Sequence, residues 1–217
     1  MQNLRIDFKL LTPINAPTKF MHLDAILAWC AVQQADYDLS AQDNLPLEKH
    51  IGAEDWCWKS SCLVFEIPEI RGNIPYVRKY DIWNWGLDYD EVIHKKNLGN
   101  INNKSGPYKA FTFCAQTLSV KNISAWCVGN KKAIETLLDS LTHIGKLTRM
   151  DLGRIMEKSV VEDKRASELW KMRTMPDYIN GYKQTFATLR PPYWQRSMRK
   201  MVWQPTDRNI KIKSMGV

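Results

Sequence analysis

The residue types best suited to chemistry gather in residues 144–154, whose sequence is Ile-Gly-Lys-Leu-Thr-Arg-Met-Asp-Leu-Gly-Arg. Glycines permit tight turns and close approach of a ligand, and backbone amides with basic side chains can surround phosphate groups. The candidate phosphate-binding residues are Gly145, Lys146, Thr148, Arg149, Gly153 and Arg154. Their order is not that of a P-loop, so a nucleotide hydrolase is not indicated. The alternative is an ordinary helix-to-strand connection with Gly145 at the end of the helix.

A second basic segment, residues 190–200, interleaves aromatic side chains with cations. Flat rings stack on unpaired bases while Arg and Lys contact phosphates, a combination suited to single-stranded RNA. The candidate RNA-binding residues in this segment are Arg190, Tyr193, Trp194, Arg196, Arg199 and Lys200. The alternative is structural, because Tyr193 and Trp194 follow two prolines and could instead hold the C-terminal segment against the core.

His143 is the main candidate for catalysis, because it is the histidine nearest to the basic loop in the sequence. Metal-independent RNA cleavage would need such a general base close to a cation, for example Lys146. However, no second acid or base is fixed by spacing, and the carboxylates show no pattern that holds two metal ions. We therefore assign no catalytic residue, no metal and no cofactor, and an RNA-processing endoribonuclease stays the alternative.

A protein interface is predicted at Trp83 and Trp85, which begin a segment rich in Asn, Gly and charge, residues 83–107. Aromatic residues often anchor protein interfaces, and long loops in compact domains are often functional. Burial of the two tryptophans beneath the loop is the alternative.

The charge of the chain is unevenly distributed. The 217 residues carry a net charge of +8, with 44% hydrophobic and 25% charged residues, a composition typical of a folded globular protein. Residues 1–108 hold 11 Lys and Arg against 14 Asp and Glu, whereas residues 109–217 hold 20 against 9. A positive field confined to one half of a chain favours a polyanionic partner, which places the nucleic-acid site in the C-terminal half.

The five cysteines, odd in number, indicate reduced thiols that pack as small apolar side chains. No Cys-x-x-Cys pair or His at zinc-finger spacing is present, so no structural zinc is predicted. No apolar run approaches the length of about 18 residues that spans a bilayer, and the first residues do not fit a signal peptide. We expect a cytoplasmic protein with no membrane partner.

The elements that must position these residues follow from periodicity. Alternation over residues 4–10 predicts a strand, and helical spacing over residues 22–34 predicts a helix packed on it. Further strands are predicted at 62–67, 76–82, 108–120, 124–128 and 152–161, and a second helix at 131–142. We expect the strand at 76–82 to pair with that at 62–67. The order of elements predicts an α+β, ferredoxin-like fold, in which two helices cover one face of a sheet.

Four segments in this order resemble the RAMP superfamily of CRISPR-associated proteins, and specifically the Cas-five-like subunit of type IV effector complexes. They are the opening strand with Leu11-Thr12-Pro13, the helix start Phe20-Met21-His22-Leu23-Asp24-Ala25-Ile26-Leu27, the basic loop 144–154, and Leu189-Arg190-Pro191-Pro192-Tyr193-Trp194. One departure is Met150-Asp151-Leu152, which stands where the superfamily loop usually has small residues.

The resemblance implies a single RAMP-like domain over residues 1–217, with 83–107 as an inserted loop and 163–217 as a basic C-terminal extension. It implies a noncatalytic subunit that holds the 5′ handle of CRISPR RNA at the loop 144–154 and caps the filament of backbone subunits. The implied partners are CRISPR RNA, a backbone (Cas-seven-like) subunit and a large-subunit-like protein, with target DNA near the handle as an open option. A purely structural subunit that binds only protein is the remaining alternative.

Overall fold

The computed structural model of the protein describes residues 1–15, 20–66, 70–78 and 110–206. The chain divides into two compact units, one formed by Met1–Ile70 with Leu118–Val217 and the other by Arg71–Thr117. The predicted loop 83–107, with Trp83 and Trp85, lies outside the described residues. Each unit is considered by itself.

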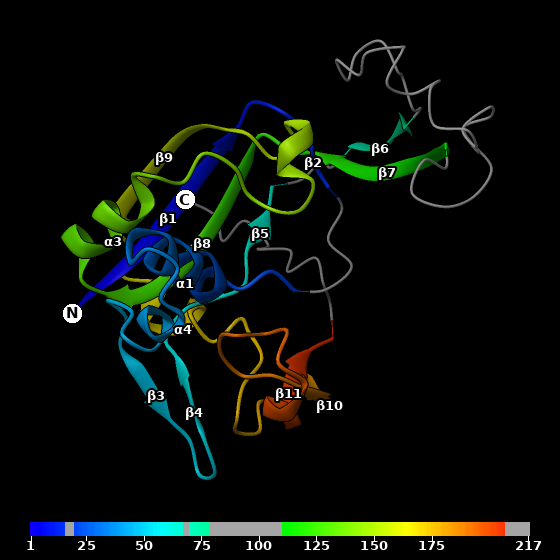
Figure 1. Ribbon diagram of the computed structural model, residues 1–217. Helices are drawn as coiled ribbons and strands as arrows, with labels where there is room; N and C mark the ends of the chain where they lie inside the picture. The colour runs from blue at the N-terminus through cyan, green and yellow to red at the C-terminus, as the bar shows by residue number, and fades with distance from the viewer. Residues whose placement is uncertain (16–19, 67–69, 79–109, 207–217) are drawn as a thin grey trace, which may run out of the picture. The chain divides into compact units, whose positions relative to one another are not determined.

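The first unit is built on a four-stranded antiparallel sheet (Figure 1). Its strands are β1 (Gln2–Leu10), β5 (Val64–Phe65), β8 (Asn122–Gly129) and β9 (Ile155–Glu162), in the order β5-β8-β1-β9. The alternation in β1 explains its central place, since Leu4, Ile6 and Phe8 are fully buried on one face. In the register, Ile6 lies opposite Ala125 of β8 and Val160 of β9.

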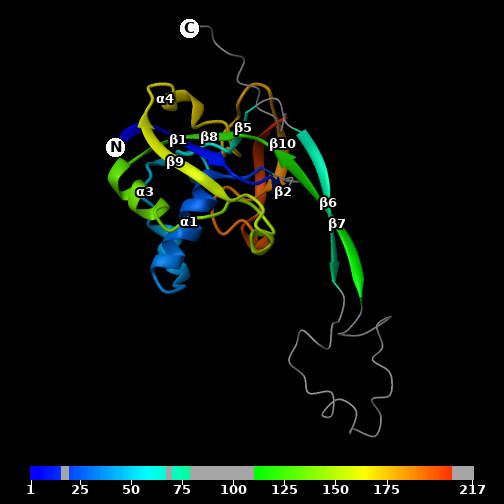
Figure 2. The ribbon, with the colours of Figure 1, turned by 90° about the horizontal axis from the view of Figure 1, so that it is seen from above.

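Helices α1 (Leu23–Gln34) and α3 (Lys131–Leu138) cover that apolar face, and the short helix α4 (Ala166–Leu169) lies on the other face (Figure 2). The side chain of Asn130 begins α3 by accepting a hydrogen bond from the backbone N–H of Ala133. The Lys158 ammonium donates to the carbonyls of Asp139 and Leu141 just after α3. These contacts explain why the helix ends at Leu138 rather than at Thr142, as the sequence predicted.

The C-terminal residues are part of the first unit. Strands β10 (Tyr182–Ala187) and β11 (Lys200–Pro205) form an antiparallel hairpin. A second apolar cluster joins this segment to the rest of the unit, and its buried members are Cys57, Val128, Trp170, Met175, Leu189 and Val202. The smaller elements are β2 (Ile14–Asn15), η1 (Leu39–Asp43), the hairpin β3 (Lys49–Ile51) with β4 (Trp56–Trp58), η3 (Thr148–Met150) and η4 (Arg196–Met198).

The second unit contains most of the paired strands β6 (Ile70–Arg78) and β7 (Phe111–Ser119). The rings of Tyr76 and Phe113 stack across this pair, with their centroids 5.2 Å apart. The pairing corrects the sequence prediction, which joined the strand at 76–82 to that at 62–67. In the structure β5 pairs with β8 instead, because this places Val64 against the buried Trp126.

The chain is therefore a mixed α and β protein with several sheets and few helices, as expected for the α+β class. The first strand, the first helix and the strands β8 and β9 lie where periodicity predicted them. None of the helices in the described ranges is long and apolar enough to cross a membrane.

Candidate functional site

The basic loop 144–154 is tied to the end of β1. The N–H of Ile144 donates to the carbonyl of Gly153 (2.8 Å), and the N–H of Gly153 donates to the carbonyl of Pro13 (2.8 Å). The Thr12 hydroxyl accepts from the N–H of Arg154 (2.9 Å) and donates to the carbonyl of Asp151 (2.6 Å). Two segments that the sequence singled out separately, Leu11-Thr12-Pro13 and the loop, are thus one structure.

Both glycines of the loop adopt backbone conformations that other residues avoid. Gly145 has φ 98° and Gly153 has φ 71°. A Cβ atom at Gly153 would lie 1.9 Å from the carbonyl oxygen and 3.0 Å from the carbonyl carbon of Ile144, which are backbone atoms that cannot rotate away. The tight turns that the sequence predicted at these glycines are therefore present, and Gly153 closes the loop.

The aromatic–basic segment is fixed by a buried ion pair that the sequence did not reveal. The guanidinium of Arg173 lies 3.1 Å from the carboxylate of Asp24 on α1, and both side chains are fully buried. Arg173 also donates to the Tyr193 hydroxyl (2.9 Å), which itself donates to Asp24 (2.9 Å). Burial raises the pKa of the Tyr193 hydroxyl, so it stays protonated and keeps this donor role. Arg173 therefore connects α1 to the C-terminal segment.

His22 packs flat against Tyr193, with ring centroids 4.6 Å apart and planes within 7° of parallel. Desolvation by burial, followed by the nearby charge of Arg173, holds the pKa of His22 well below its ordinary value of 6.5. The imidazole is therefore neutral at physiological pH and offers a flat, uncharged face. This arrangement supports the structural alternative for Tyr193, whose hydroxyl is committed to protein partners.

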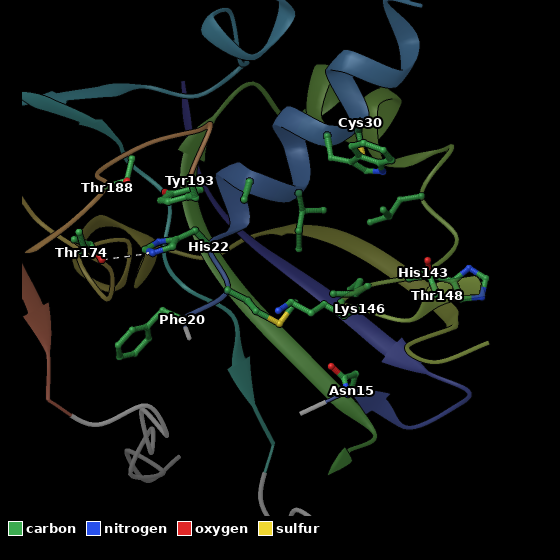
Figure 3. A pocket seen from close by; sticks show the side chains of 18 of the residues that line it. Asn15, Phe20, His22, Cys30, His143, Lys146, Thr148, Thr174, Thr188 and Tyr193 are labelled. Atoms are coloured by element: carbon green, nitrogen blue, oxygen red, sulfur yellow. Dashed lines mark hydrogen bonds between the residues drawn. The ribbon is translucent and has the colours of Figure 1, made fainter. Parts of the chain in front are cut away.

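A pocket of about 1040 Å³ lies where α1, the basic loop and the C-terminal hairpin meet (Figure 3). Of the residues predicted from sequence, it brings together Gly145, Lys146, Thr148, Tyr193 and Arg199. The basic loop and the aromatic–basic segment, which are separate in the sequence, thus contribute to one cavity. Its wall combines aromatic side chains, hydroxyls and amides, a surface suited to an organic ligand with both flat and polar parts.

The predicted cations differ in whether they form ion pairs with carboxylates of the protein. Lys146 and Arg199 line the pocket, and neither has an ion pair within the described part of the chain. Arg149 and Arg196 are exposed and also have no such pair among residues 1–15, 20–66, 70–78 and 110–206, but they do not line the pocket. The charges with the fewest protein partners therefore lie on the loop and around η4.

The other three predicted cations contact carboxylates. Arg190 and Lys200 both lie 2.7 Å from Asp55, and Arg190 also lies over the ring of Trp56. Arg154 is 3.9 Å from Asp151. Asp55 therefore offsets two of the positive charges that the sequence counted as available for phosphates.

Trp194 is 73% exposed and does not line the pocket. Sequence reasoning predicted no binding role for several side chains of the pocket wall, among them Trp29, Phe186 and Thr188. Trp29 had a usable signal, because it lies on α1 outside the apolar stripe and is 56% exposed. A large aromatic side chain that stays exposed on a helix indicates a candidate binding surface.

His143 lines the same pocket, but both nitrogens of its ring have partners. Nε2 lies 3.1 Å from Asp151, and Nδ1 lies 2.9 Å from the Thr142 hydroxyl. Within the described ranges, no three His, Cys, Asp or Glu side chains gather in a way that could hold a metal ion. The pocket wall offers cations, hydroxyls and flat rings, which are groups that can bind a ligand.

A family of known proteins matches this chain over nearly its whole length. The family is described as CRISPR type IV associated protein Csf3, and the match covers residues 2–205. The chain belongs to the Csf3 family. No curated protein matches the chain. The type IV CRISPR assignment that the resemblance implied is thereby confirmed, and as a type IV CRISPR-associated protein this Csf3-family chain belongs with the other subunits of such a system.

Proposed function

We propose that this Csf3-family chain is the noncatalytic RNA-binding subunit of a type IV CRISPR effector complex, and that it holds the 5′ handle of CRISPR RNA. The observation that carries the proposal is the meeting of the basic loop and the C-terminal segment at one pocket, with Lys146 and Arg199 free of ion pairs in the described part of the chain. Free cations beside aromatic rings suit a single-stranded polyanion.

The sheet supports the finer assignment of the fold. The strands lie in the order β5-β8-β1-β9 in the sheet. Along the chain, α1 comes between β1 and β5, and α3 comes between β8 and β9. This arrangement agrees with a ferredoxin-like unit in which two helices cover one face. In this proposal the first unit is a RAMP-type RNA-recognition domain. The loop that leads from α3 to β9 carries the phosphate contacts.

The proposed partners follow from the same assignment. The chain caps a filament of backbone (Cas-seven-like) subunits and contacts a large-subunit-like protein, while Trp83 and Trp85 stay the predicted protein anchor. The N-terminal half is slightly acidic by sequence, with 11 basic against 14 acidic residues over 1–108, so it suits protein better than phosphate. The proposal leaves open whether the chain also contacts target DNA near the handle.

Reversing the two free charges of the pocket tests RNA binding. The double variant Lys146→Glu with Arg199→Glu is expected to weaken binding of single-stranded RNA at least about tenfold. It should also reduce the slope of log affinity against log salt by about 1.4, because each lost phosphate contact releases about 0.7 fewer counterions. Fluorescence anisotropy at several salt concentrations measures both quantities.

The matched control is Lys132→Glu with Lys164→Glu, which makes the same charge change at two exposed lysines away from the pocket. It should change affinity only through the long-range field, and so by much less. Equal losses in the two double variants would mean that the net charge of the protein, and no local site, binds the RNA.

The noncatalytic assignment predicts that the wild type and His143→Ala both leave the RNA intact. The reason is that both ring nitrogens of His143 contact Asp151 and Thr142, so the imidazole is not offered to a ribose hydroxyl. Labelled RNA incubated with each protein and separated on a denaturing gel checks this. A discrete product that forms with the wild type and disappears with His143→Ala would instead favour the endoribonuclease.

A further inference from the structure

Thr188 carries a buried hydroxyl that the protein leaves unused. The residue is 5% exposed, it lines the pocket, and its Oγ1 has no hydrogen-bond partner among the described residues. Buried hydroxyls are nearly always paired, because removal from water without a new partner is unfavourable. A hydroxyl can both donate and accept, so a ligand with either kind of group could satisfy it.

The wall beside Thr188 is aromatic and rigid. Thr188 precedes Leu189, whose carbonyl accepts a hydrogen bond from the Tyr193 hydroxyl (3.3 Å), so Thr188 lies at the Tyr193 end of the pocket. Figure 3 shows the rings of Tyr193, His22 and Phe20 one after another along this wall. Since Asp24 and Arg173 hold the Tyr193 hydroxyl, the Tyr193–His22 stack cannot rearrange freely. A flat ligand therefore meets a preformed surface.

The rest of the pocket supplies positive charge and room. Lys146 and Arg199 line it without ion pairs in the described ranges, and Trp29 and Phe186, 56% and 61% exposed, stand at its rim. A volume of about 1040 Å³ exceeds that of one nucleobase and leaves space for its ribose and phosphate. A flat heterocycle joined to an anionic group is the ligand class that these features share.

We infer that this pocket receives one unstacked nucleobase of the bound RNA. The base lies against the aromatic wall, its polar edge forms a hydrogen bond with the Thr188 hydroxyl, and the adjoining phosphate lies near Lys146 and Arg199. The inference rests on the proposed function, and it adds a site that reads a base where the loop contacts only phosphates. Removing that one base from the RNA should therefore lower the binding affinity more than removing any other base.

The test uses the full-length protein and the CRISPR RNA that co-purifies with it. The 5′ end of this RNA is sequenced, resynthesised with a fluorescent label, and made in versions that each lack a single base. Anisotropy titrations against the wild type are expected to show one position at which the missing base weakens binding about tenfold or more, because stacking and the edge contact are both lost.

The variant Thr188→Val removes the hydroxyl and nearly keeps the shape. Its affinity for the complete RNA is expected to be about threefold to tenfold lower than that of the wild type. Its affinity for the RNA that lacks the key base should equal that of the wild type. Its melting temperature should be no lower than that of the wild type. Loss of an unpaired hydroxyl should not destabilise the free protein. Thr136→Val, an exposed threonine on α3, is the matched control and should leave every RNA affinity unchanged.

Three results would overturn the inference. The first is RNA binding whose affinity does not depend on any single base. An equal loss of affinity for the complete and the base-lacking RNA in Thr188→Val counts as the same result. Either finding leaves the proposed function standing. The second is saturable binding of free nucleoside monophosphates that Thr188→Val abolishes, with no positional effect in RNA, which would make the pocket a site for free nucleotides. The third is the absence of any bound or co-purifying RNA, which removes the proposed function as well.

Discussion

Arg173→Met is expected to lower the free energy of unfolding by about 3–5 kcal/mol, the cost typical of removing one partner from a buried ion pair. The carboxylate of Asp24 would remain fully buried with the Tyr193 hydroxyl as its main partner. The carbonyls of Trp58 and Ser60, which accept from the guanidinium at 2.6 and 3.2 Å, would also lose their donor. Urea unfolding followed by circular dichroism measures the loss.

The control for this change is Lys171→Met, two residues away, where the ammonium is solvent-exposed and pairs with Glu168 (2.9 Å). Such an exposed pair contributes little, so the control should lose about 1 kcal/mol or less. The double variant Asp24→Leu with Arg173→Met removes the unpaired charge and should recover part of the stability lost by Arg173→Met alone. A loss under about 1 kcal/mol for Arg173→Met would mean that the C-terminal segment is not anchored through this residue.

Local patterns predicted the scaffold because they act over a few neighbouring residues. The alternation of Leu4, Ile6 and Phe8 gave the central strand, and the apolar stripe of residues 23–34 gave the helix that covers it. The pairing of β6 with β7 was missed for the opposite reason. Strand partners depend on contacts between residues far apart in the chain, which periodicity does not encode.

The positive charge counted in the C-terminal half is partly paired with carboxylates in the structure, which the sequence did not reveal. By sequence, Arg173 and Arg190 add to a positive field directed at phosphate, but in the structure Asp24 and Asp55 of the N-terminal half pair with them. A carboxylate separated by more than a hundred residues cannot be assigned to a cation from sequence alone. The positive charge available to phosphates is therefore smaller than the count suggests. Of the predicted cations without an ion pair in the described ranges, Lys146 and Arg199 line the pocket.

The pocket shows which residues of a binding site can be predicted from the sequence. The basic loop and the aromatic–basic segment were both identified from residue types, since glycine, cation and aromatic patterns are local. That they meet depends on Arg173, which has no distinguishing sequence signal. Thr188 could not be identified either, because an unpaired hydroxyl becomes visible only when every neighbour is placed.

Gly153→Ala is expected to disrupt the loop and weaken RNA binding more than tenfold, with a loss of up to about 3 kcal/mol in stability. The new Cβ would press on the backbone of Ile144, while the residue would keep a positive φ of 71° that disfavours alanine. Relief requires the loop to separate from Pro13, to which the Gly153 N–H now donates (2.8 Å). Lys146 would then move away from the pocket, and the loss of one phosphate contact suffices for a tenfold change, equivalent to about 1.4 kcal/mol.

Gly181→Ala separates the effect of the clash from the effect of the backbone conformation. Gly181 has φ 83°, close to that of Gly153, but an added Cβ there meets no atom within 4 Å. This control should lose only the cost of a left-handed alanine, about 1–2 kcal/mol, and should bind RNA as the wild type does. Anisotropy and urea unfolding of both variants decide the matter. If Gly153→Ala loses stability but keeps full RNA affinity, the loop does not position the phosphate contacts; if both variants lose affinity alike, general destabilisation explains the effect.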